Sequence, residues 1–254
     1  MNIYILTLGR AGNQVTWSNL PNNVKKNTRL VVQSFEKDLY RDLPIVVLPD
    51  HIKNLPDTRQ WLMYEHGHTS DKVAMLDDDL RFFKRRKDDR EKFEKADATD
   101  IEELFSAISE GLDTHSHVGV LSREGGNRVV EAFKETTRMS RVLAYNVSIA
   151  KKLGILFNRV LLPEDFDTTL QYLYKGHKNK VLCNWVHDQG GSNAVGGCST
   201  YRSLDVHNKH MIHFGTLHPN IVSVVEKTTK TAWGGGTRMD VIIQWKKALG
   251  KGLV

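Results

Sequence analysis

Short apolar runs rich in β-branched residues recur along the chain, and this pattern constrains the fold more than any other feature. Seven candidate strands occupy residues 2–7, 29–34, 44–48, 72–76, 117–122, 141–147 and 180–186. Most of them lack the alternation of a strand with one wet face, so we expect them to be covered on both faces. Helix-like stretches separate several of these runs. The pattern therefore predicts an α/β fold with a mixed, mostly parallel sheet flanked by helices.

Two of the intervening stretches have helical character. "DTRQWLMYEHG" (57–67) opens on Asp57 with Gln60 three residues later, a pair similar to a capping box, and it closes at Gly67. In "TDIEELFSAISEGLD" (99–113) the apolar residues recur at helical spacing. We predict both stretches as helices, with Asp57 as the N-cap of the first.

Composition limits the class of protein. The 254 residues are 40% hydrophobic, which suits a globular chain with one sizeable core or two small ones. Two cysteines, Cys183 and Cys198, are too few for a disulfide framework, so we expect a reducing compartment. No segment approaches the ~20 apolar residues that cross a bilayer, and the N-terminus lacks a cleavage signal. We therefore expect a cytoplasmic protein without a membrane partner.

Charge is unevenly spread along the chain. The net charge of +6 and pI near 9.2 favour an anionic partner. The stretch "RFFKRRKDDREKFEKAD" (81–97) is highly charged, and we keep two interpretations of it: a solvated loop or an acceptor-binding excursion. Glycine-rich stretches at 188–198 and 233–237 are interpreted as loops over a site or as part of a tail.

Three adjacent aspartates end the apolar run of "VAMLDDDLRF" (73–82). Neighbouring carboxylates repel one another, so a bound cation or a hydrogen-bond network is expected there. Residues two apart share one face of a strand, so Asp77 and Asp79 can converge on one ligand while Asp78 points elsewhere. Oxygen ligands suit Mg²⁺ or Mn²⁺, and open α/β sheets bind ligands at the carboxyl ends of strands. The alternative is a solvated acidic turn that caps a helix.

Four blocks in a fixed order resemble the GT-A-fold nucleotide-sugar glycosyltransferases over roughly residues 3–188. They are "IYILTLGR", "DTRQWLMYEHG", "VAMLDDDLRF" and "LLPEDFDTTLQYLYKGH". The resemblance implies one GT-A-like domain over residues 1–254. Within it, residues 1–80 would bind the nucleotide sugar, residues 81–220 would form the acceptor and catalytic half, and residues 221–254 would form a C-terminal tail region.

The resemblance also implies a donor site. The first block suggests that the nucleotide contacts Thr7, Gly9 and Arg10. The second makes Arg59 a candidate contact to the diphosphate or ribose. The third implies that Asp77 and Asp79 hold Mn²⁺ or Mg²⁺, with Asp77 on the metal or the ribose.

Sugar transfer from a nucleotide diphosphate also needs a base. Negative charge develops on the leaving diphosphate, where a divalent metal stabilises it, and a carboxylate must accept the acceptor proton. The candidates are Glu164 and Asp165, and the resembling motif favours Asp165. A helix that begins near Pro163 would place both at its positive end and keep them ionised. The alternative is a plain helix N-terminus with favourable acids.

Two further residues are candidates from the later part of the chain. Many metal-dependent members of the resembling fold add a histidine after the acidic-pair helix, and we select His187 as the third metal ligand. His207 and His213 are alternatives, and a structural role is the competing interpretation for each. Arg202 is a candidate phosphate contact, with a solvated arginine as its alternative.

A narrower similarity identifies an acceptor. The segments "GRAGNQVTWSNL", "LPDTRQWLMYEHG" and "MLDDDLRFFKRR" are similar to the TET/JBP-associated glycosyltransferases of phages. This implies a UDP-sugar donor and a 5-hydroxymethylpyrimidine in double-stranded DNA as acceptor, and the basic excess fits a DNA partner. The competing hypotheses are a glycosyltransferase that acts on protein, glycan or lipid, a nucleotidyltransferase, and a noncatalytic nucleic-acid-binding module.

Overall fold

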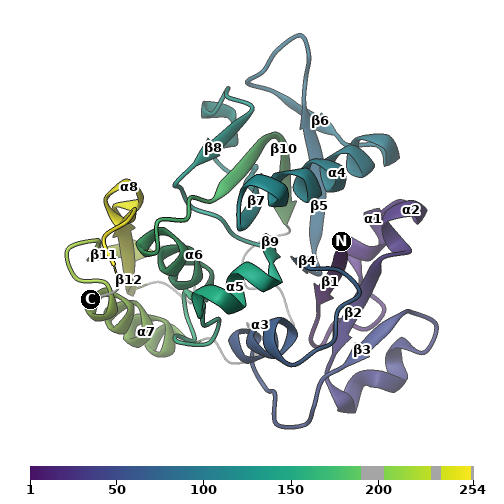
Figure 1. The fold of residues 1–254 in the computed structure, drawn as a ribbon, viewed down its shortest axis with the longest axis horizontal. Helices are drawn as coiled ribbons and strands as arrows, with labels where there is room; N and C mark the ends of the chain where they lie inside the picture. Colours follow the sequence, from purple (N-terminus) through teal and green to yellow (C-terminus); the bar gives the residue numbers. More distant parts are fainter. Residues whose placement is uncertain (190–202, 230–235, 253–254) are drawn as a thin grey trace.

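The computed structural model describes residues 1–189, 203–229 and 236–252, and within them ten strands form one mixed sheet (Figure 1). The strand order is β3-β2-β1-β4-β9-β7-β10-β5-β6, and β8 pairs with β10. The strands are β1 Asn2–Leu6, β2 Thr28–Val32, β3 Ile45–Val47, β4 Lys72–Asp77, β5 Leu80–Arg85, β6 Phe93–Lys95, β7 His117–Ser122, β8 Phe133–Glu135, β9 Val142–Asn146 and β10 Lys180–Gln189.

Helices cover both faces of this sheet. They are α1 Val15–Asn19, α2 Asn22–Lys25, α3 Leu55–Tyr64, α4 Ala98–Thr114, α5 Val147–Leu153 and α6 Glu164–Tyr174, with 3-10 turns η1 Ser34–Tyr40 and η2 Gly126–Arg128. Along β1, Ile3 and Ile5 pack in the core with α4, whereas Tyr4 and Leu6 pack in a second core with α3 and α5. The strands are thus buried on both faces, as their unbroken apolar runs indicate.

The predicted fold class is confirmed. Strands β3, β2, β1 and β4 are parallel neighbours, and β7 and β10 are parallel to each other. Strand β9 lies antiparallel between β4 and β7, and β5 is antiparallel to β10. Because β9 is antiparallel to both β4 and β7, β7 runs in the same direction as β4, and so does β10, which is parallel to β7. The sheet is therefore mixed, with most strands in one direction, and all seven predicted strands are present.

The loop interpretation of residues 81–97 is wrong for β5 and β6, which pair antiparallel, and holds for residues 86–92, which connect the two strands. Leu80 and Phe82 are buried. Arg85 is also buried, and its guanidinium donates to the carbonyls of Cys183 at 2.6 Å and Gly126 at 2.9 Å. A buried arginine is tolerated in a strand when carbonyl groups accept its hydrogen bonds.

The predicted start of α3 needs correction. The N-cap is Asn54, whose side chain accepts a hydrogen bond from the backbone of Asp57 at 2.9 Å, so Asp57 lies in the first turn. Pro56 also lies in this first turn, where its missing N–H costs nothing. The α4 helix is confirmed, and it begins with a capping box of Asp97 and Asp100.

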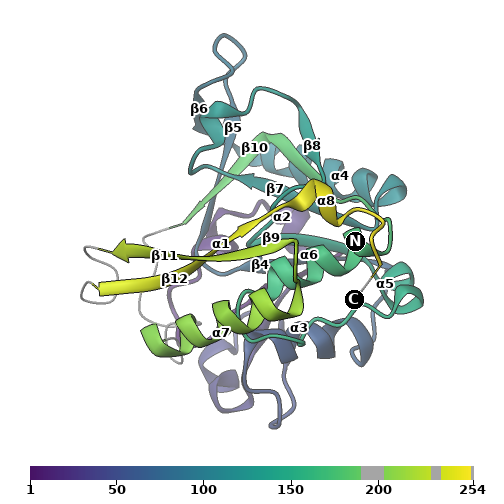
Figure 2. The ribbon, with the colours of Figure 1, turned by 90° about the vertical axis from the view of Figure 1, so that its left-hand side faces the viewer.

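The C-terminal region is an ordered unit that packs on α6. It comprises α7 Leu204–Leu217, the antiparallel ribbon of β11 Val222–Thr229 and β12 Gly236–Ile243, and α8 Trp245–Ala248 (Figure 2). Leu170 and Leu173 of α6 share a buried cluster with Phe214 of α7 and Val222 of β11. Residues 221–254, expected as a tail region, thus contain three regular elements. Among the described residues, no helix is both long and apolar enough to traverse a bilayer.

Candidate active site

The three aspartates lie at the carboxyl edge of the sheet. Strands β1 and β4 are parallel with Leu6 opposite Asp77, so the residues that follow both strands meet at this edge. Strand β4 ends at Asp77, and Asp78 and Asp79 form the turn into β5. Thr16 fixes this turn, because its hydroxyl donates to the carbonyl of Asp77 at 2.6 Å and accepts from the backbone of Leu80 at 2.8 Å.

Asp78 is the buried member of the triplet and ties it to the first strand. Its carboxylate accepts a hydrogen bond from Thr7 at 2.6 Å and another from Arg10. Burial raises the pKa of Asp78, although the Thr7 bond and the Arg10 charge oppose the rise. The sequence pattern gave Asp78 no role in the site. Its position is structural, since it holds the β1 loop against the aspartate turn.

The predicted nucleotide contacts lie together beside this turn. Arg10 reaches Asp79 at 3.0 Å in addition to Asp78. Gly9 has a φ of 66°, a conformation that favours glycine, and its N–H donates to Glu36 at 2.7 Å. Glu36 on η1 is buried, and one of its oxygens has no partner among the described residues. No local sequence signal pointed to Glu36.

Asp77 is the carboxylate of the triplet whose ionised form a bound cation would stabilise most directly. Within the described residues its side chain makes no hydrogen bond or ion pair, and burial raises its pKa to about 7, with Asp79 and Asp78 adding to the rise. The charges of Arg59 and Arg141 oppose it. A divalent cation would stabilise the ionised form of Asp77 directly.

The donor set fits a weakly held hard cation. Asp77 and Asp79 are both partly exposed. In the part of the chain that the structure describes, no group of three or more His, Cys, Asp or Glu is arranged to hold a metal ion. Mg²⁺ is commonly held by one or two carboxylates while waters and substrate phosphates complete the shell, so two carboxylates suffice.

Arg59 joins the aspartate turn to the acidic helix. Its guanidinium forms an ion pair with Glu164 at 2.7 Å, although the two residues are 105 positions apart, and their side chains are only 5% and 9% exposed. Burial opposes the charge of Arg59, but Glu164, Asp77 and Asp165 together raise its pKa. Contact between Arg59 and a diphosphate or ribose stays a prediction.

Asp165 differs from its neighbour Glu164 in having no cationic partner within ion-pair distance among the described residues. Burial raises the pKa of Asp165 to about 6, and the charge of Glu164 adds to the rise. The helix N-terminus was expected to keep this carboxylate ionised, and burial acts against that effect. A base with a pKa of about 6 is ionised at neutral pH and still well matched for proton transfer.

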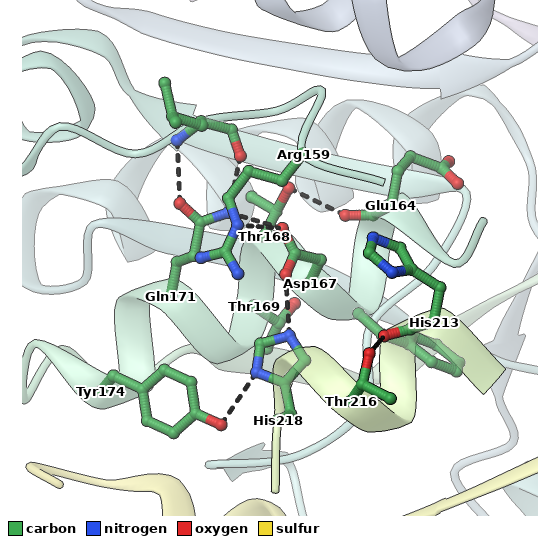
Figure 3. Close-up of polar contacts among 12 residues, drawn as sticks. Arg159, Glu164, Asp167, Thr168, Thr169, Gln171, Tyr174, His213, Thr216 and His218 are labelled. Carbon is green, nitrogen blue, oxygen red and sulfur yellow. Dashed lines mark hydrogen bonds and ion pairs between the residues drawn. The ribbon is translucent and has the colours of Figure 1, made fainter. Parts of the chain in front are cut away.

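A buried network fixes the helix that carries these acids. Asp167 on α6 lies 2.8 Å from a ring nitrogen of His218, and the other ring nitrogen lies 2.9 Å from the hydroxyl of Tyr174 (Figure 3). Gln171 donates to the second oxygen of Asp167 at 2.8 Å. Since His218 directly follows α7, the C-terminal unit holds α6 in place.

The remaining site predictions have different outcomes. His187 lies on β10, is fully buried, and neither ring nitrogen has a partner among the described residues. Burial, with Arg141 and Arg138, lowers its pKa to about 3, so the ring is neutral. A metal-ligand role for His187 stays a prediction. Arg202 and most of the glycine-rich stretch 188–198 lie outside the described residues.

Comparison with known proteins gives a family match and two phage relatives. The sequence profile of the family described as TET-Associated Glycosyltransferase matches residues 1–197. Proteins named beta-glucosyl-HMC-alpha-glucosyl-transferase, from Enterobacteria phage T6 and Enterobacteria phage T2, are each 24% identical over 198 residues, which is 71% of this chain and 68% of the relative.

A solved structure shows a weaker likeness. It is a mannosyltransferase from Pyrobaculum calidifontis in complex with GDP-Man and Mn²⁺, with 13% identity and a TM-score of 0.48. The match covers 70% of this chain and 53% of the mannosyltransferase, so the chain spans about half the length of that protein. We draw no functional argument from this likeness.

Proposed function

Because the chain belongs to the TET-associated glycosyltransferase family, we propose that it transfers a sugar from a UDP-sugar to the hydroxyl of a 5-hydroxymethylpyrimidine in DNA. Family membership makes it a glycosyltransferase, and the donor, the metal and the acceptor are our proposal. One observation carries it: Arg59 forms a buried ion pair with Glu164 at the start of α6, and its charge also acts on Asp77 and Asp165. Leaving-group and acceptor chemistry can therefore meet at one place.

The donor side is formed by the β1 loop and the aspartate turn. Thr7, Gly9 and Arg10 face the nucleotide in this proposal, and Asp77 and Asp79 hold Mn²⁺ or Mg²⁺. The metal, when bound, acts as a Lewis acid that stabilises the charge developing on the leaving diphosphate. Asp78 keeps Thr7 and Arg10 in position, since it accepts hydrogen bonds from both side chains.

The acceptor side is formed by the start of α6. We assign Asp165 as the base that removes the proton of the acceptor hydroxyl. Glu164 is already engaged by Arg59, whereas the carboxylate of Asp165 accepts only the backbone N–H of Phe166, at 2.9 Å, among the described residues. Glu164 then acts as a positioning residue that keeps Arg59 charged and in place.

The phage relatives favour a second candidate acceptor. Their name describes transfer of an alpha-glucosyl group to beta-glucosyl-HMC, a hydroxymethylcytosine that already carries glucose. The hydroxyl acceptor of this chain would then belong to a DNA-linked sugar rather than to the hydroxymethyl group. In this proposal both acceptors use the same donor site and Asp165 as the base.

The test is transfer to defined duplexes with product mass as the readout. Unmodified DNA, DNA containing 5-hydroxymethylcytosine or 5-hydroxymethyluracil, and DNA containing glucosylated 5-hydroxymethylcytosine are each incubated with UDP-glucose, UDP-galactose or UDP-N-acetylglucosamine. We expect the mass of one sugar residue, hexose or N-acetylhexosamine according to the donor, added to a modified duplex, and loss of this product in Asp165→Asn. Donor hydrolysis without any DNA-linked sugar would point to a protein, glycan or lipid acceptor. A nucleotidyl mass would overturn the glycosyltransferase assignment.

A further inference from the structure

Most of the net positive charge of the chain lies near its C-terminus. Residues 221–254 contain six Lys or Arg and two Asp or Glu, a net charge of +4, and the whole chain has a net charge of +6. The family match ends at residue 197. The charge that favours a polyanionic partner is therefore concentrated in a segment that follows the family-matched region.

The β11–β12 ribbon presents part of this charge on one face. Val224 faces α7, because a side-chain carbon added at Gly215 would lie 2.5 Å from it. Side chains alternate across a strand, so the adjacent positions point away from α7. This outer face carries Lys227 opposite Arg238, and their side chains are 54% and 38% exposed.

The two cations of the outer face share a single carboxylate. Asp240 lies 2.7 Å from Lys227 and 3.2 Å from Arg238. Exposed ion pairs of this kind contribute little to stability, so a phosphate can compete for either cation. One positive charge is in excess even with both pairs formed.

The ribbon extends toward the edge of the sheet that carries the candidate active site. Figure 2 shows the end of β11 and the start of β12 on the same side of the molecule as the end of β10. At that end of β10, Gln189 pairs with Leu80, the residue after Asp79. The start of α7 holds the ribbon there, because Asn208 accepts from the backbone of Met239 at 2.8 Å.

We propose that the outer face of the ribbon binds the phosphate backbone of duplex DNA beside the acceptor nucleotide. This inference rests on the proposed function, since it supplies the duplex that the acceptor belongs to. Each eight-residue strand spans about 26 Å. At 3.4 Å per phosphate along one DNA strand, that length covers about eight base pairs. Phosphate contacts of this kind position a duplex without reading its sequence.

The test measures duplex binding at several salt concentrations by fluorescence anisotropy. We compare the wild-type chain with Lys227→Ala/Arg238→Ala and with the charge-preserving Lys227→Arg/Arg238→Lys. The matched control is Lys26→Ala/Lys152→Ala, which removes one exposed cation beside α2 and one on α5. Loss of two phosphate contacts should reduce the slope of log Kd against log salt by about 2. The charge-preserving variant and the control should keep the wild-type slope.

A second measurement distinguishes a role of the ribbon in DNA binding from a role in donor binding. Lys227→Ala/Arg238→Ala should raise KM for the modified duplex and leave calorimetric UDP affinity unchanged. Equal slopes in the ribbon variant and the matched control would overturn the proposal, whatever the transfer activity. If the wild-type chain binds DNA through the ribbon but transfers no sugar to any duplex, the proposed function fails and the ribbon assignment stands.

Discussion

The buried ion pair of Arg59 and Glu164 yields the sharpest prediction, because its loss should affect stability and, in our proposal, Arg59 also contacts the donor. At an N–O distance of 2.7 Å and an effective dielectric of about 20, the Coulomb attraction is about 6 kcal/mol before desolvation is subtracted. Removing one partner of such a buried pair typically costs 3–5 kcal/mol, because the other charge stays buried and unpaired. We therefore expect Arg59→Met to lower the free energy of unfolding by about 3–5 kcal/mol.

The assay is urea unfolding combined with thermal denaturation. For a chain of this size a loss of 3–5 kcal/mol corresponds to a fall in Tm of about 6–20 °C. Arg86→Met is the matched control, since the ion pair of Arg86 with Asp88 is exposed at 42% and 66%, and its loss should leave the free energy of unfolding close to the wild-type value. The double variant Arg59→Met/Glu164→Gln should recover part of the loss, because neither charge is left alone.

Two outcomes would refute this reasoning. If Arg59→Met destabilises the chain no more than Arg86→Met, the pair is not buried as described. If the loss of unfolding free energy in the double variant equals the sum of the losses in Arg59→Met and Glu164→Gln, the two residues are not coupled. Calorimetry at a temperature where Arg59→Met is folded tests the donor role separately. A direct phosphate contact predicts UDP affinity lower by about 10- to 100-fold.

Three further predictions address the metal, the base and the buried histidine. EDTA should abolish transfer and Mn²⁺ or Mg²⁺ should restore it, whereas full activity in chelator would contradict ligation by Asp77 and Asp79. Because the pKa of Asp165 is raised to about 6 and a base must be ionised, kcat should fall as the pH falls through about 6. Asp165→Asn should lower kcat by roughly 10²–10⁴-fold and abolish this acidic fall in the pH profile of kcat. His187 has a folded pKa of about 3, so the unfolded state binds more protons below pH 6.5 and stability falls on acidification. At pH 5.5, His187→Leu should avoid about 1.4 kcal/mol of that loss, as measured by urea unfolding.

The sheet was predictable because its strands are buried on both faces and read as unbroken apolar runs. Strand β5 was not, since three of its six residues are Arg or Lys and Arg85 is buried among carbonyl groups supplied by distant segments. The ribbon did carry a signal, the β-branched run of residues 222–229, but the neighbouring glycines favoured a tail. A short, partly polar strand is difficult to predict from sequence unless the strand with which it pairs is known.

The site was predictable as a set of residue types and less so as a set of contacts. An aspartate triplet at the end of an apolar run is visible in the sequence. Which of the three carboxylates is held by hydrogen bonds depends on the residue at which the strand ends. Strand β4 stops at Asp77, so Asp78 turns inward to Thr7 and Arg10. The pairing of Arg59 with Glu164 joins positions 105 residues apart, and no local pattern encodes it.

The C-terminal unit connects the proposed base to the proposed DNA surface. Leu173 and Tyr174 of α6 are buried in the same cluster as Phe214 and Val222, and Asp167 is paired with His218. Asp165 stands two residues before Asp167 on the same helix, so the position of the base depends on contacts made by α7 and the ribbon. In our proposal, a duplex that binds the ribbon contacts the same packed unit that positions Asp165, so acceptor placement and the proton-accepting group are linked through a continuous core.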